Sequence, residues 1–83
     1  MIAQKWDYES RTYHPYTIPA GWRITAGGYG LNEICQCAQC GKKLPFGDCY
    51  TSREIHTRMG MGFAVCEQCY EQEWERERKA KRR

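Results

Sequence analysis

The chain has 83 residues, six of them cysteines, and a formal net charge of +3. A chain of this length buries only about 60% of the surface that it exposes when unfolded, so domains of this size are often stapled by disulfides or by a metal ion. It has room for one domain. Residues 76–83 carry a net charge of +5, so the rest of the chain sums to −2 (+3 minus +5), which excludes a basic globule.

The first residues, Met1 to Glu9, contain neither an apolar run nor a small-residue cleavage pattern. We therefore expect no secretory signal peptide. No stretch of about 18 consecutive apolar residues follows, so we expect no membrane span and no membrane partner. We accordingly expect a cytoplasmic protein, in a compartment where thiols are kept reduced and clustered cysteines indicate metal or redox chemistry.

Residues 1–34 form an aromatic-rich N-terminal segment that we expect to pack as β structure on the rest of the chain. The tetrapeptide Ile18-Pro19-Ala20-Gly21 is typical of a turn, because Pro suits the second position of a turn and Gly the fourth. Its flanks, residues 13–18 and 22–25, carry strand formers, so we predict a short hairpin there. We expect three large side chains of the segment to complete the core: Tyr16, Trp22 and Ile24.

The central region, residues 35–75, holds two cysteine pairs with a second predicted hairpin between them. Residues 49–56 follow a Gly-Asp pair and are rich in strand formers. Residues 63–65 resume as a strand after the glycines of Met59-Gly60-Met61-Gly62, which suit a chain reversal.

A helix is predicted from Glu67 onward, because this stretch has no Gly, no Pro and no β-branched residue. Its acidic residues come first and its basic residues last, which matches the helix macrodipole. Only Tyr70 and Trp74 offer an apolar face. We therefore expect a helix that is anchored near its start and extends into solvent as a basic helical tail, residues 76–83.

Cys37-Ala38-Gln39-Cys40-Gly41 and Cys66-Glu67-Gln68-Cys69 are two Cys-x2-Cys pairs separated by 25 residues. Two intervening residues let both sulfurs of a pair reach one ion at about 2.3 Å, and two pairs complete a tetrahedron. The glycine after the first pair tolerates the backbone turn that points amide N–H groups at the thiolates. The pattern predicts one zinc ion per chain, bound by Cys37, Cys40, Cys66 and Cys69.

Other interpretations of the cysteines stay open. A redox Cys-x-x-Cys of the thioredoxin type needs a βαβ unit, for which the chain is too short. Rubredoxin binds iron with two such pairs, each forming a knuckle commonly closed by glycine. Here the second pair runs into the predicted helix, which favours zinc. A disulfide framework is disfavoured, because we expect a chain that is not exported and whose thiols are kept reduced.

At these residues the chain resembles the treble-clef zinc fingers, the group that includes LIM-type and related cross-brace domains. The matching parts are the knuckle at Cys37, Cys40 and Gly41, the hairpin at residues 49–65, and the helix start at Cys66 and Cys69. The resemblance spans about residues 35–80 and implies a small zinc-stabilised α+β fold. The alternative is a zinc ribbon, with a third strand in place of the helix. The tract is also similar to small uncharacterised proteins of bacteria, phages and mobile elements.

Cys35 and Cys49 fall outside the predicted quartet. Cys35 could exchange for Cys37, but only Cys37 has the two-residue spacing to Cys40. We expect Cys49 to start a strand as a small buried or half-exposed thiol, and His56 on the same strand to be a structural or surface histidine. A second metal site has no supporting spacing among the four remaining candidates, Cys35, Cys49, His14 and His56.

No set of residues in the sequence has the arrangement that a catalytic site needs. Ser52, Glu54 and His56 would share one face of a strand, but such a row does not bring a nucleophile into contact with its base. Zinc held by four thiolates has no open position for water or substrate. We expect no enzymatic activity and no small-molecule substrate.

Two kinds of partner remain. We favour a protein partner and an adaptor role, because treble-clef domains frequently present a flat surface or a sheet edge to other proteins. The alternative is nucleic-acid binding, although alternating Glu and Arg along the helix weakens a continuous positive stripe. The candidate nucleic-acid contacts are Lys42, Lys43, Arg78, Lys79, Lys81 and Arg82.

Overall fold

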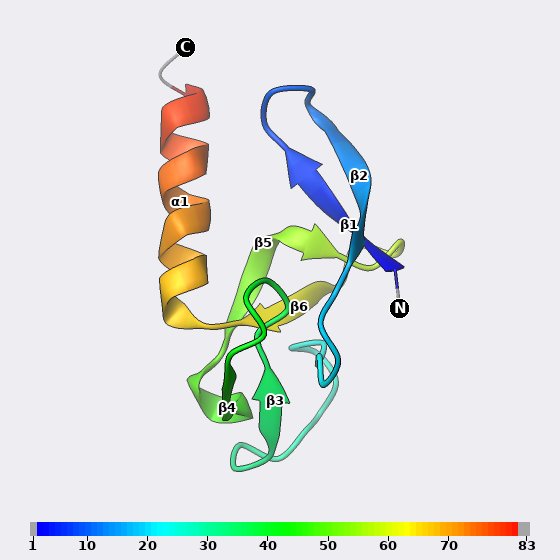
Figure 1. Cartoon of the computed structure of the whole chain (residues 1–83), viewed down its shortest axis with the longest axis vertical. Helices are drawn as coiled ribbons and strands as arrows, with labels where there is room; N and C mark the ends of the chain where they lie inside the picture. The colour runs from blue at the N-terminus through cyan, green and yellow to red at the C-terminus, as the bar shows by residue number, and fades with distance from the viewer. Residues whose placement is uncertain (1, 82–83) are drawn as a thin grey trace.

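A computed structural model describes residues 2–81, and this part of the chain forms antiparallel sheets and a C-terminal helix (Figure 1). In chain order the elements are β1 (Ile2–Asp7), β2 (Thr12–Thr17), β3 (Ile34–Gln36), β4 (Lys43–Pro45), the short 3-10 helix η1 (Phe46–Asp48), β5 (Tyr50–His56), β6 (Gly62–Val65) and α1 (Glu67–Lys81). One sheet has the strand order β2-β1-β5-β6, and β3 pairs with β4 in a second sheet. The predicted α+β class is confirmed. Within residues 2–81, no helix is long and apolar enough to cross a membrane.

The N-terminal hairpin is formed by β1 and β2, which pair antiparallel along their whole length. Its turn lies at residues 8–11. There the Asp7 carboxylate accepts hydrogen bonds from the backbone N–H of Glu9 and from the hydroxyl of Ser10. An Asp side chain that accepts a hydrogen bond from the backbone N–H two residues later is typical of a tight turn. The middle of β1 also pairs with the end of β5, which joins the N-terminal segment to the central hairpin.

The predicted hairpin around the Ile18–Gly21 turn is wrong. The chain does bend there, with Gly21 at a φ of +80°, a left-handed conformation that glycine adopts readily. The segment after the bend forms no strand beside β2. Instead, Ile24 makes an isolated antiparallel bridge to Phe63 of β6. Burial explains the difference, because Trp22 and Ile24 pack against the core from this position.

The predicted central hairpin is confirmed, since β5 and β6 pair antiparallel. Their register shifts between Thr51 and His56, so β5 is irregular there. At the irregularity the Oγ of Ser52 accepts hydrogen bonds from the backbone N–H groups of Glu54 and Ile55, at 3.2 and 2.8 Å. The expected row with Ser52, Glu54 and His56 on one face is therefore broken. Ser52, Glu54 and Ile55 are the buried residues of the strand.

The helix α1 packs along β5 well beyond its first turn (Figure 1), which differs from the expected anchor near its start. Glu73 is fully buried, and its carboxylate accepts hydrogen bonds from the Ser52 hydroxyl and the Arg53 backbone N–H, both at 2.7 Å. One turn further, Arg76 donates two hydrogen bonds of 2.8 Å to the buried carboxylate of Glu54. The helix has few apolar residues that could pack against the sheet, so hydrogen bonds and an ion pair to β5 hold it in place.

The hydrophobic core gathers side chains from β1, β5, β6 and the start of α1. Its largest fully buried apolar members are Phe63, Ile55 and Val65. The three predicted side chains of the N-terminal segment pack against it: Tyr16, Trp22 and Ile24. Three cysteines of the predicted quartet, Cys37, Cys66 and Cys69, belong to the same buried cluster. The core and the cysteine site are therefore continuous.

Candidate metal centre

The first cysteine pair lies on the tight loop that joins β3 to β4. The backbone N–H of Gly41 donates to the carbonyl of Cys37 at 2.9 Å, and Gly41 has a φ of +79°, as a knuckle requires. The backbone N–H groups of Gln39 and Cys40 point at the Sγ of Cys37, at 3.4 and 3.5 Å. The chain around Cys37 thus has the amide-to-sulfur geometry that stabilises a thiolate.

The second pair begins the helix. β6 ends at Val65, and the carbonyl of Cys66 accepts the backbone N–H of Tyr70 at 3.0 Å, so Cys66 is the N-cap of α1. Cys69 lies in the first turn. Residues three apart lie on the same side of a helix, so both sulfurs face the knuckle.

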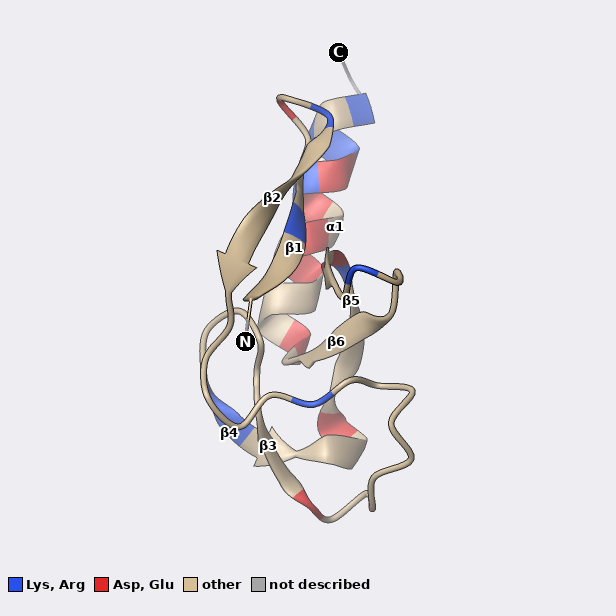
Figure 2. Cartoon of the chain, turned by 90° about the vertical axis from the view of Figure 1, so that its right-hand side faces the viewer, with Lys and Arg blue, Asp and Glu red and all other residues tan. Residues whose placement is uncertain are grey.

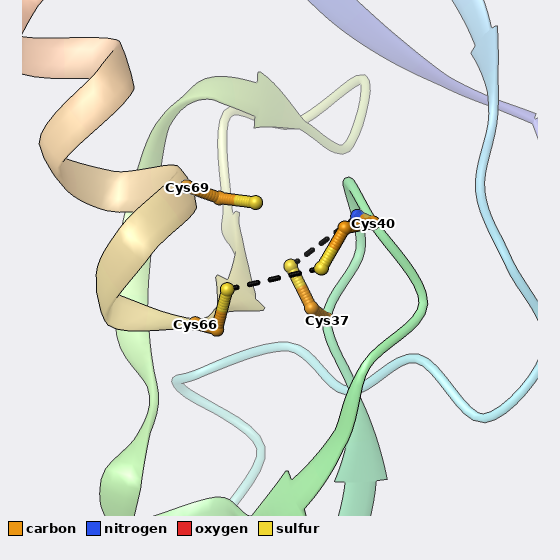
Figure 3. Close-up of side chains that lie close together, drawn as sticks. All are labelled: Cys37, Cys40, Cys66 and Cys69. Carbon is orange, nitrogen blue, oxygen red and sulfur yellow. Dashed lines mark hydrogen bonds between the residues drawn. The ribbon is translucent and has the colours of Figure 1, made fainter.

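The four sulfurs meet in one cluster, with their side chains converging from the knuckle and the helix start (Figure 3). Each sulfur lies within 4.8 Å of the others, and the Sγ atoms of Cys40 and Cys66 are 3.8 Å apart. A tetrahedral ion bound to sulfur at about 2.3 Å has sulfur–sulfur edges of about 3.8 Å. Three of the cysteines are buried and Cys40 is exposed. The cluster therefore could hold a metal ion, with Cys40 on its accessible side.

The electrostatics of the cluster are those of crowded thiols. Burial acts to raise the pKa of Cys37, but the backbone N–H groups of Cys40, Cys66 and Gln39 directed at its sulfur outweigh burial and lower that pKa to about 7. Burial, together with the neighbouring Cys66 and Cys37 sulfurs, raises the pKa of Cys69. Negative charge on one sulfur thus opposes ionisation of another. A bound cation would offset that repulsion, and its binding would release protons.

Cys35 and Cys49, the two cysteines without an assigned role, lie side by side. Their Sγ atoms are 3.2 Å apart. Cys35 is buried on β3, and Cys49 is partly buried between η1 and β5. Burial and the adjacent Cys35 thiol raise the pKa of Cys49 to about 12. No spacing pattern in the sequence indicates this contact, because 14 positions and a turn separate the two residues.

The two histidines occupy different surroundings. His56 lies edge-on to the ring of Tyr13, whose hydroxyl is 3.4 Å from Nδ1, and burial lowers the pKa of this histidine. The Nε2 atom of His14 is 2.9 Å from the Ser10 hydroxyl and 3.4 Å from the Asp7 carboxylate.

Among residues 2–81, the quartet is the one group of cysteine, histidine or acidic side chains arranged to hold an ion.

The predicted nucleic-acid contacts fall into two groups at opposite ends of the elongated molecule (Figure 2). Lys42 and Lys43 are exposed beside the knuckle and β4, whereas Arg78, Lys79 and Lys81 lie on the last turns of α1. The molecule measures 40 Å along its longest axis. The helical group consists of Arg78, Lys79 and Lys81, while Arg82 lies outside the described residues.

Acidic side chains accompany the basic group on α1. Arg78 pairs with Glu75, and the Lys81 amine lies 3.7 Å from the Glu77 carboxylate. Lys79 lines a groove between α1 and the β1–β2 hairpin. The structure thus does not bring these candidates into one basic surface within residues 2–81.

An aromatic row lies across β5 and α1; sequence reasoning paired Tyr70 with Trp74 but missed the contacts of Tyr50 and Arg53. Tyr50 stacks on Tyr70, with ring centroids 4.9 Å apart and an interplanar angle of 13°. Trp74 meets Tyr70 edge-on at 6.2 Å, and the Arg53 guanidinium covers the Trp74 ring at 4.1 Å. The spacing of Tyr70 and Trp74, four residues apart on a helix, was the available signal.

Three glutamates flank the aromatic row along α1: Glu67, Glu71 and Glu75. All three are exposed, and in the described part of the chain Glu67 and Glu71 form no ion pair. Like charges spaced by four helical residues repel one another. We name the hollow beside them the acidic aromatic groove. It is lined by Tyr50, Glu67, Gln68, Tyr70, Glu71, Gln72, Trp74, Glu75 and Arg78.

No protein-family model matches the chain. No curated protein and no solved structure is significantly similar to it.

Proposed function

We propose that the protein is a non-catalytic, cytoplasmic protein-interaction adaptor whose fold is held by one structural zinc ion. The observation that carries the proposal is the cluster of four cysteine sulfurs within 4.8 Å of one another. Tetrahedral sites of four thiolates are typical of structural zinc and leave no coordination position for water or substrate. The ion would hold the knuckle against the helix start, and partner recognition would fall to the surface.

Zinc is favoured over iron by the asymmetry of the two cysteine pairs. The first pair is a knuckle closed by Gly41, whereas the second begins α1 with Cys66 as its N-cap. A rubredoxin-like iron site would have a knuckle on both sides. Zinc also suits a closed structural role, because it has no redox chemistry and takes tetrahedral sulfur ligands.

The order of the elements supports a treble-clef finger. A knuckle is followed by the β5–β6 hairpin and then by a helix whose first turn carries the second cysteine pair. A zinc ribbon would have a strand where α1 lies. The β1–β2 hairpin then extends the β5–β6 hairpin into a four-stranded sheet, which gives this chain more core than the finger alone.

The acidic aromatic groove supports an adaptor that binds a basic protein segment. Aromatic residues are enriched at the energetic centres of protein interfaces. Aromatic faces and carboxylates both attract cationic side chains, and the Trp74 ring already carries the Arg53 guanidinium at 4.1 Å. A partner rich in Lys or Arg would also relieve the repulsion between Glu67 and Glu71.

Nucleic-acid binding is the second candidate, and the exposed Lys79 and Lys81 on the last turns of α1 favour it. Phosphate recognition needs several cations along one continuous surface. The basic groups at the two ends of the molecule are separated by the glutamates of α1 (Figure 2). This distribution makes a protein partner the better supported proposal.

Elemental analysis of the purified chain tests the metal. We expect one zinc ion per chain, loss of zinc and of the fold in Cys66→Ser, and unfolding on addition of a chelator. Cys49→Ser is the matched control, because it removes a thiol outside the quartet and should retain one zinc ion. A protein without zinc, or equal losses in the two variants, would contradict the structural zinc.

A binding titration tests the surface, with a Lys/Arg-rich peptide and a DNA duplex as probes over a range of salt concentrations. We expect the peptide to bind, Trp74→Ala to abolish binding, and Glu71→Gln to weaken it. Glu9→Gln, the same charge change on the β1–β2 turn, should have no effect. DNA binding that falls steeply with salt and is lost in a Lys79→Gln/Lys81→Gln variant would support the second candidate instead.

A further inference from the structure

Cys35 and Cys49 are the two cysteines outside the metal cluster. Their Sγ atoms lie 3.2 Å apart although 14 positions separate them in the chain. Neither belongs to the four residues whose sulfurs cluster within 4.8 Å. A disulfide has a sulfur–sulfur distance of about 2.05 Å, so an approach of about 1.2 Å would join this pair.

The fold itself holds the two sulfurs together. Cys35 is the central residue of β3 and pairs with Leu44 of β4. After β4 the chain turns through η1, where the backbone N–H of Cys49 donates to the carbonyl of Phe46 at 3.1 Å. The Sγ of Cys49 then lies 3.7 Å from the carbonyl oxygen of Pro45. Strand pairing and the helical turn thus place both ends of the contact by backbone hydrogen bonds.

We propose that Cys35 and Cys49 form a reversible disulfide, a modification site separate from the metal centre. The oxidant is a low-molecular-weight disulfide such as oxidised glutathione. Cys49, the more accessible thiol, loses its proton and attacks one sulfur of the oxidant, which expels one glutathione thiolate and leaves a mixed disulfide. The raised pKa of Cys49 keeps its thiolate form scarce at neutral pH, so we expect this first step to be slow. Cys35 then loses its proton and attacks the Sγ of Cys49, which expels the second glutathione thiolate. Two protein thiols are oxidised, and one glutathione disulfide is reduced to two thiols that take up the two protons.

The crosslink would act on the metal-binding segment. The loop that it closes contains Cys37 and Cys40, two of the four candidate ligands. The knuckle would therefore be fastened to the start of β5 by a bond that does not depend on the ion. Closing a loop of about 15 residues restricts the unfolded chain, so we expect the oxidised form to melt about 10 °C or more above the reduced form. We also expect it to release metal to a chelator more slowly.

The test is a redox titration of the metal-loaded protein with reduced and oxidised glutathione, followed to equilibrium and quenched by alkylation. Trypsin cleaves after Lys42 and Lys43, so Cys35 and Cys49 leave in separate peptides unless they are linked. We expect the intact mass to fall by two hydrogens, with the two peptides linked and the metal content unchanged. Dithiothreitol should restore the two hydrogens and separate the two peptides.

Two variants assign the bond. In Cys35→Ser we expect no internal disulfide and a glutathione adduct on Cys49, because the attacking thiol is absent. In Cys49→Ser we expect neither product. The proposal is overturned by full alkylation of both cysteines in the wild type under oxidised glutathione, by a stable glutathione adduct on wild-type Cys49, or by a disulfide to a quartet cysteine. Cys35, Cys37 and Cys40 share the tryptic peptide of residues 24–42, so fragmentation of the linked wild-type peptides assigns the bond to Cys35 or to a quartet cysteine even where a variant fails to fold.

Discussion

The buried ion pair between Glu54 and Arg76 offers a sharp test of how α1 is held. The Nε and Nη2 atoms of Arg76 each donate to a carboxylate oxygen of Glu54 at 2.8 Å. The Glu54 side chain is 1% exposed and that of Arg76 is 39% exposed. The substitution Arg76→Gln would remove the cation and leave a buried carboxylate without its partner.

The expected cost follows from the burial of the two groups. Breaking a fully buried ion pair by removing one partner costs about 3–5 kcal/mol. Water reaches the half-exposed position of Arg76 and resolvates part of the carboxylate, so we expect a loss of about 2–3 kcal/mol. For a domain of this size, that loss lowers the melting temperature by about 10–20 °C. Arg78→Gln is the matched control, because its partner Glu75 is 59% exposed and the variant should change stability by less than about 0.5 kcal/mol.

Urea unfolding of the metal-saturated protein, followed by far-ultraviolet circular dichroism, measures the difference at equal metal occupancy. A shifted midpoint with an unchanged slope reports a change in stability. The double variant Glu54→Gln/Arg76→Gln should regain part of the loss, because no charge remains buried. Equal midpoints for Arg76→Gln and Arg78→Gln would refute the reasoning that this pair anchors the helix.

Three further predictions concern single side chains. Gly41→Ala should cost about 1–2 kcal/mol and weaken zinc binding, measured by chelator competition, because the strain comes from the φ of +79° and the new Cβ would meet Pro19 only at an ordinary 3.6 Å. Glu73→Ala should cost about 3 kcal/mol in urea unfolding because two buried hydrogen bonds to a carboxylate are lost, while the exposed Glu75→Ala should change little. Burial lowers the pKa of His56 below 6.5, so the neutral ring stabilises the fold above pH 6.5 and that stability is lost as pH falls through the lowered pKa. His56→Gln should therefore flatten the decline of stability below pH 6.5, and an unchanged pH profile would contradict this.

The parts of the molecule that sequence reasoning predicted correctly are encoded over short distances. The knuckle needs four consecutive residues and a glycine, and Gly41 has the expected left-handed backbone. The β5–β6 hairpin is set by strand formers on both sides of a glycine-rich turn. The helix follows from an uninterrupted run of good helix formers that starts at Glu67, where α1 does begin.

The parts that sequence reasoning missed depend on contacts between distant segments. The Ile18–Gly21 bend was recognised, but its hairpin was wrong because local turn preference does not say which strand β2 will pair with. The contact between α1 and β5 extends further along the helix than predicted. Hydrophobic periodicity takes account of apolar residues only, whereas polar side chains make this contact. Buried Glu73 is held by a hydroxyl and an amide of β5, and both became available only where that strand is irregular.

The cysteines show the same difference between features that local sequence encodes and features that depend on contacts between distant segments. Spacing alone singled out Cys37, Cys40, Cys66 and Cys69, because two residues between ligands is a local requirement of one ion shared by two pairs. Their convergence within 4.8 Å needed the hairpin that brings the helix start to the knuckle. The contact of Cys35 with Cys49 was decided by tertiary structure alone, because strand pairing and the turn of η1 set it and no sequence spacing encodes it. Residue spacing thus indicates which cysteines could bind a metal ion, whereas the packing of the chain places the other two thiols in contact.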